Sequence, residues 1–163
     1  MSDAGIHSGN APKPVGHYPH ARRVGQWLYL SGVGPRDPLS NSAPGNVYAQ
    51  DGALASYDIA AQTHSVFANV GRILADCGAS WDDVIDVTVY LTDMARDFTT
   101  YNAIWAQYFP DAARAPCRTT VGITALPAPI AIEFKCVALL PPPDRTRRHH
   151  AIARSHQPAT MDR

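Results

Sequence analysis

Apolar positions along the chain follow two different periods, which predict helices separated by strands. From Ser56 to Cys77 apolar residues recur at steps of three and four, so this stretch is expected to form a helix with one apolar face that stops at Gly78. The same spacing predicts a second helix over Asp97–Phe109, closed by Pro110. The strands are therefore expected before, between and after these two helices.

Four stretches alternate β-branched, aromatic and polar residues as strands do. They are Val24–Ser31, Asp83–Leu91, Arg118–Thr124 and Ile130–Leu140. This order predicts a single α+β domain with a mixed sheet and both helices on one face, in which the last two strands pair antiparallel across a short turn. The final strand is apolar on both sides, so the uncovered sheet face predicts self-association.

Both ends of the chain lack an apolar periodicity. Residues 1–14 and 141–163 are therefore predicted to be flexible, and residues 15–140 to form the domain. The C-terminal segment holds five Arg against two Asp, which leaves a net charge of −3 on the first 140 residues. Such a basic tail is typical of a solvated extension or of a contact with nucleic acid, whereas the acidic body disfavours nucleic acid as a partner.

Composition argues against several protein classes. No apolar run approaches the roughly 20 residues of a membrane span, and the first residues do not resemble a signal peptide. The cysteines, Cys77, Cys117 and Cys136, are odd in number and lack metal-ligand spacing. We expect a cytoplasmic protein with no metal and no other cofactor, and no membrane partner.

Two charged residues near the end of the domain are candidates for chemistry. Glu133 is the only glutamate and lies within an apolar strand, either as an edge residue paired with Lys135 or as a site carboxylate that orients water and moves protons. Arg118 begins the preceding strand, either as a surface ion pair or as a planar anchor for a carboxylate. On adjacent strands the two would define a small polar site.

Several motifs of the chain resemble the RidA family, also called the YjgF/YER057c/UK114 family. They are GHYPHA, LYLSG, GRILADCGASWDDVIDVTVYLTDM, YNAIWAQYF and RTTVGITALPAPIAIEFKCVA. The resemblance covers Gly16–Leu140 and implies a chorismate mutase-like fold, a homotrimer, alone or paired as a dimer of trimers, and hydrolysis of enamines and imines.

The resemblance also implies roles for single residues. Arg118 matches the carboxylate-binding arginine of the family and Glu133 its site glutamate, while Tyr18, Gly32 and Asn102 match positions that line the pocket. One position departs from the family pattern. Thr120 stands where general imine deaminases often carry cysteine, so thiol chemistry is not implied.

The sequence of one loop is similar to that of a single branch of this family. SGVGPRDP, at the start of the long loop Gly32–Asn46, is similar to the 2-aminomuconate deaminases. In such an enzyme Arg118 would hold the substrate carboxylate and Glu133 would place a water at the imine carbon, with backbone groups near Gly32 and Thr120 assisting. Products would be 4-oxalocrotonate and ammonia.

The second carboxylate of 2-aminomuconate would need its own cation. Arg36 in the long loop is the candidate, and its alternative is a solvated pair with Asp37. Three other functions stay open: a general 2-iminobutanoate and 2-iminopropanoate deaminase, a non-catalytic trimer that binds small acids, and a ribonuclease. Glu133 disfavours the binding-only protein, because carboxylate binding alone needs no buried acid.

Overall fold

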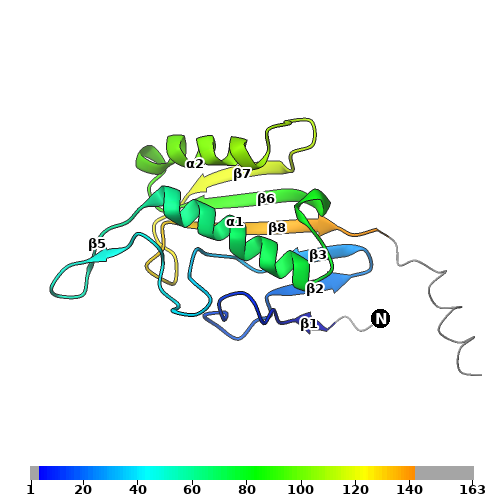
Figure 1. Cartoon of the computed structure of the whole chain (residues 1–163), viewed down its shortest axis with the longest axis horizontal. Helices are drawn as coiled ribbons and strands as arrows, with labels where there is room; N and C mark the ends of the chain where they lie inside the picture. The colour runs from blue at the N-terminus through cyan, green and yellow to red at the C-terminus, as the bar shows by residue number, and fades with distance from the viewer. Residues whose placement is uncertain (1–3, 142–163) are drawn as a thin grey trace, which may run out of the picture.

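The computed structural model describes residues 4–141, which form one six-stranded sheet with two α-helices on one of its faces (Figure 1). The sheet order is β1-β2-β3-β8-β6-β7. Its strands are β1 (Gly5–Ile6), β2 (Ala21–Val24), β3 (Trp27–Leu30), β6 (Val84–Leu91), β7 (Cys117–Gly122) and β8 (Ile132–Leu139). The helices are α1 (Ile59–Asp76) and α2 (Met94–Tyr108), and a short 3-10 helix, η1 (Trp81–Asp83), precedes β6. The expected α+β architecture is confirmed.

Helix boundaries follow from capping side chains. Asp58 accepts a hydrogen bond from the Ala61 backbone amide at 3.1 Å and so begins α1. Asp93 caps α2 in the same way, accepting from the Arg96 amide at 3.0 Å. The second helix therefore starts three residues before its predicted start at Asp97, because its first turn carries little apolar periodicity. Neither α-helix of residues 4–141 has the length and apolarity to span a membrane.

The strand order corrects the predicted pairing of the last two strands. β6 and β7 are parallel across α2, but β8 lies between β3 and β6 and is antiparallel to both. β7 and β8 are therefore not neighbours. A strand that is apolar on both sides is most stable in the centre of a sheet, and the connection from Gly122 to Ile132 is long enough to carry it there.

Other differences concern short elements. The predicted strand Val24–Ser31 is part of the hairpin β2–β3, which turns at Gly25 with φ of +60°. A separate two-stranded hairpin, β4 (Val47–Tyr48) and β5 (Leu54–Ser56), follows the long loop and extends from the body (Figure 1). Such brief strands carry too few alternating positions to be predicted.

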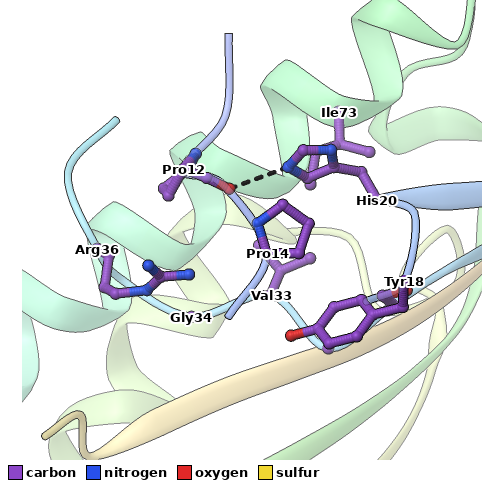
Figure 2. Close-up of a pocket in the computed structure, with 10 residues that line it drawn as sticks. Pro12, Pro14, Tyr18, His20, Val33, Gly34, Arg36 and Ile73 are labelled. Carbon is purple, nitrogen blue, oxygen red and sulfur yellow. Dashed lines mark hydrogen bonds between the residues drawn. The ribbon is translucent and has the colours of Figure 1, made fainter. Parts of the chain in front are cut away.

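The N-terminal segment, expected to be flexible over residues 1–14, is packed where the structure describes it. β1 pairs with β2, and the Ser8 amide donates to His20 Nδ1 at 2.9 Å. Nε2 of His20 therefore carries the hydrogen and donates to the Pro12 carbonyl at 2.9 Å (Figure 2). The ordered part of the domain thus begins before residue 15. The predicted basic tail beyond Pro141 lies outside the described residues.

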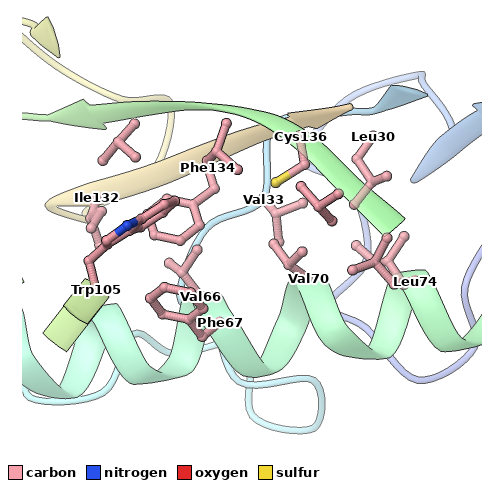
Figure 3. Close-up of a cluster of buried hydrophobic side chains, with 14 of the residues drawn as sticks. Leu30, Val33, Val66, Phe67, Val70, Leu74, Trp105, Ile132, Phe134 and Cys136 are labelled. Atoms are coloured by element: carbon pink, nitrogen blue, oxygen red, sulfur yellow. The ribbon is translucent and has the colours of Figure 1, made fainter. Parts of the chain in front are cut away.

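The core lies between the helices and one face of the sheet (Figure 3). Phe67 of α1 packs edge-to-face on Phe134 of β8, with ring centres 5.1 Å apart, and stacks on Tyr108 at 3.7 Å. Within residues 4–141, no helix covers the opposite sheet face, and this face exposes large apolar side chains. Trp27 and Tyr29 are 43% and 44% exposed there.

Candidate functional site

Arg118 lies on the helix-covered side of the sheet, at the edge strand β7. Its register partner on β6 is Val87, which is fully buried under the helices, so both side chains point to that side. The guanidinium Nη2 donates to Asn102 Oδ1 of α2 at 2.9 Å. The guanidinium carbon lies 4.9 Å from the Trp105 ring centre and 5.4 Å from that of Tyr101. We call this group, with Thr120, the arginine half-site.

Glu133 lies on the other face of the sheet and on its central strand. Its register partner is Tyr90, and its carboxylate packs directly on Gly32, where an added Cβ would overlap Oε1. Burial raises the pKa of Glu133, while the charge of Arg36 opposes that rise. The predicted alternative of an edge residue paired with Lys135 is wrong, because Lys135 donates to the Leu30 carbonyl.

Tyr18, Gly32 and Arg36 line one cavity, which Glu133 does not itself line although its carboxylate packs on Gly32. We call these four residues the glutamate half-site. Pro12 and Pro14 of the N-terminal segment form its other wall (Figure 2). The sequence analysis did not identify these prolines, because residues 1–14 were expected to be flexible.

Arg36 is held by its own loop and by the N-terminal segment, and not by Asp37. Its guanidinium donates to Asn41 Oδ1 and, at 2.7 Å, to the Lys13 carbonyl. Asp37 instead accepts from the amides of Leu39 and Ser40. The alternative of a solvated Arg36–Asp37 pair is therefore wrong, and the guanidinium is fixed at the rim of the cavity.

The two half-sites cannot meet within one chain. Arg118 registers with Val87 and Glu133 with Tyr90, three positions further along β6, so the two side chains project from opposite faces. The prediction that they lie on adjacent strands is wrong, since β6 stands between β7 and β8. No small ligand could therefore touch both Arg118 and Glu133 of the same chain.

Two aromatic residues next to Arg118 were missed as site residues. Tyr101 and Trp105 are one and three positions from Asn102 on α2, among the residues whose spacing predicted a helix over Asp97–Phe109. Tyr101 and Trp105 are four positions apart, so they lie on the same face of α2, and this spacing was the one signal that both lie beside the same strand. Within residues 4–141, His, Cys, Asp and Glu side chains form no group of three that could hold a metal.

Gly32→Ala tests the contact between the loop and the glutamate. The new methyl group would overlap Glu133 Oε1 and force the carboxylate to move, so we expect kcat to fall about tenfold. The melting temperature should change little, because the atoms that the methyl group overlaps are the end of a flexible side chain and not backbone. Gly9→Ala is the matched control, since nothing lies within 4 Å of its added Cβ. Equal activity of both variants would remove Gly32 from the site.

Comparisons with known proteins agree with this fold. The family model described as Endoribonuclease L-PSP matches residues 8–140. A RutC family protein of Pyrococcus horikoshii is 38% identical over 133 residues, which is 82% of this chain and 94% of that protein. The chloroplastic Reactive Intermediate Deaminase A of Arabidopsis thaliana is 36% identical over 130 residues, 80% of this chain and 62% of that protein.

A solved structure gives the same result. RidA from a Psychrobacter species superposes with a TM-score of 0.70 at 28% identity, covering 84% of this chain and 99% of that one. The family model spans nearly all of the described residues, and the relatives align over most of the chain. The chain therefore belongs to the Endoribonuclease L-PSP family, together with the RutC and RidA proteins.

Proposed function

We propose that this protein is a hydrolytic deaminase of small imines and enamines that carry a carboxylate beside the C–N carbon. The observation that carries the proposal is that each half-site supplies one of the two charged groups that the reaction needs. One presents a cation suited to a carboxylate, Arg118, and the other a half-buried acid with a raised pKa, Glu133. The name of the Arabidopsis relative, a reactive intermediate deaminase, supports the same reaction class.

The chemistry needs a fixed substrate, one water and a proton carrier. Arg118 of one copy holds the substrate carboxylate, which fixes the neighbouring imine carbon in front of Glu133 of the next copy. The Glu133 carboxylate takes a proton from the water as its oxygen bonds to that carbon. It then returns the proton to the nitrogen, which gives a carbinolamine. Glu133 next takes the proton of the carbinolamine hydroxyl and passes it to the amino nitrogen, so that the C=O bond forms as the C–N bond breaks, and ammonia and a 2-oxo acid leave.

Assembly of the site requires self-association. The sheet face that carries Glu133 also exposes Trp27, Tyr29 and Leu139, each more than 40% exposed, and such apolar groups favour burial against a second copy. We propose the homotrimer that the family resemblance implies, with each site between two copies. Full turnover by a sedimenting monomer would contradict it.

Two substrate classes compete for this site. The first is short 2-imino acids such as 2-iminobutanoate, which need only Arg118 and Glu133. The second is 2-aminomuconate, which is favoured by one observation: Arg36 is fixed at the rim of the cavity that Gly32 and Tyr18 line, where a second carboxylate would reach it. Ammonia release from both substrates, each generated enzymatically and measured side by side, separates the two classes.

Arg36→Ala tests the 2-aminomuconate proposal. If Arg36 binds the far carboxylate, kcat/KM on 2-aminomuconate should fall about tenfold, equivalent to about 1.4 kcal/mol, while 2-iminobutanoate turnover changes little. Arg72→Ala, an exposed arginine of α1 that donates to Asn69, is the control for loss of a nearby positive charge. Equal losses on both substrates would show that Arg36 acts through Glu133 or the loop, and no loss would remove it from substrate binding.

A further inference from the structure

Three polar atoms are buried without a hydrogen-bond partner at the arginine half-site. They are Arg118 Nη1, Thr120 Oγ1 and the Tyr101 hydroxyl, and each is closed to solvent within the described part of the chain. They form one cluster, because Arg118 and Thr120 project from the same face of β7 and the Arg118 guanidinium lies over the Tyr101 ring. Burial raises the pKa of Tyr101, and Thr120 and Arg118 oppose that rise. A native structure rarely keeps three such groups together unless they serve one another or a ligand.

Packing does not explain the Tyr101 hydroxyl. The ring is fully buried and contacts Trp105 and Phe134 edge-to-face at 6.2 and 6.3 Å, contacts that phenylalanine would keep. A buried hydroxyl without a partner destabilises the fold. Packing does not explain the Thr120 hydroxyl on β7 either, because a valine side chain would fill the same space without a buried polar atom. Arg118 and Thr120 are two positions apart on β7 and so share one face, and the Arg118 guanidinium carbon lies 5.4 Å from the Tyr101 ring centre.

The second terminal nitrogen of the guanidinium, Nη2, does have a partner on α2. Nη2 donates to Asn102, and the plane of the group lies by the rings of Tyr101 and Trp105. A free arginine on an edge strand would sample several rotamers, and a planar fork binds a carboxylate well only in one orientation. The two hydroxyl oxygens are therefore available to accept from Nη1, which would hold that nitrogen against α2 while the remaining donors of the guanidinium face the substrate.

We propose that Tyr101 and Thr120 are positioning residues for Arg118. Their hydroxyl oxygens accept from Nη1 once a carboxylate draws the guanidinium into line, so carboxylate affinity depends on both. The inference rests on the proposed function only for the identity of the ligand, a 2-oxo or 2-imino acid. The positioning itself is a property of the free binding site and can be measured without turnover.

The test is calorimetric titration of the assembled protein with 2-oxobutanoate, an unreactive product of the proposed reaction. Tyr101→Phe and Thr120→Val should each raise Kd about tenfold. Thr120→Ser, which keeps the hydroxyl, should restore affinity. Tyr108→Phe, which removes a hydroxyl from the same helix that bonds to His64 instead, is the matched control and should bind as the unaltered protein does.

A double-variant comparison separates positioning from general stability. In an Arg118→Lys background, Tyr101→Phe should cause no further loss, because lysine has no Nη1 to hold. Unchanged Kd in both hydroxyl variants, an equal loss in the lysine background, or no binding of 2-oxobutanoate by the unaltered protein would each overturn the inference. If the variants behave as expected but imines release no ammonia, the proposed reaction fails and the positioning role stands.

Discussion

Arg118→Ala should lower kcat/KM on any carboxylate-bearing imine by two to three orders of magnitude. A charge-assisted, bidentate contact supplies roughly 1.5 to 3 kcal/mol, and its loss also frees the substrate to leave the reactive orientation. Arg118→Lys should recover little, because an ammonium group lacks the planar fork and cannot occupy the Asn102 contact in the same geometry. Initial rates of ammonia release over a range of substrate concentrations measure the effect.

The matched control is Arg114→Ala. Arg114 lies in the connection before β7 and its side chain is 76% exposed, with only a 4.0 Å contact to Asp82. Its removal changes the net charge equally and should leave kcat/KM unchanged. Near-normal turnover by Arg118→Ala, or a comparable loss in Arg114→Ala, would show that Arg118 is not the carboxylate anchor.

Glu133→Gln should abolish most turnover and stabilise the fold at neutral pH. The amide is isosteric with the carboxylate but cannot take a proton from water, so kcat should fall by about 10² to 10⁴. Asp82→Asn, a substitution at a side chain that is 88% exposed, controls for loss of one negative charge. Retained kcat in Glu133→Gln would assign the proton transfer to another group.

The stability effect follows from the direction of the pKa shift. Burial raises the pKa of Glu133 in the folded chain above the ordinary value of 4.5, so the ionised form is less favourable folded than unfolded. This cost is absent well below pH 4.5, grows as pH rises through the folded pKa, and is complete above it. Thermal melts should therefore show Glu133→Gln more stable than the unaltered protein at pH 7, with a smaller difference at pH 4.

The sequence predicted the structure best where a regular apolar spacing and the family resemblance both concern the same stretch of chain. The apolar face of α1 and the alternation of β6 predicted both elements to within a few residues, and Arg118 and Asn102 are in contact as expected for one pocket. These features depend on local spacing. The close approach of Gly32 to Glu133 could also be anticipated, because the family resemblance placed both in the pocket.

Strand order could not be predicted in the same way. Nothing local distinguishes a β8 that pairs with β7 from one inserted between β3 and β6, since the choice depends on burying a strand that is apolar on both sides. That choice decides the site: adjacent strands would have put Arg118 and Glu133 together in one chain, whereas the inserted strand puts them on opposite faces. Arg36 shows a second limit, because its partners, Asn41 and the Lys13 carbonyl, are set by the tertiary packing of a segment expected to be flexible.

Subunit mixing tests the assembled site most directly. Arg118→Ala and Glu133→Gln chains, each inactive alone, are unfolded together in equal amounts, refolded and assayed for ammonia release from an imine that the unaltered protein hydrolyses. If each site takes its arginine from one copy and its glutamate from the next, random assembly restores both groups at about a quarter of the sites, and about a quarter of the normal activity should return. Mixed assemblies that stay as inactive as the separate variants, although both chains are shown to co-assemble, would contradict a site shared between copies.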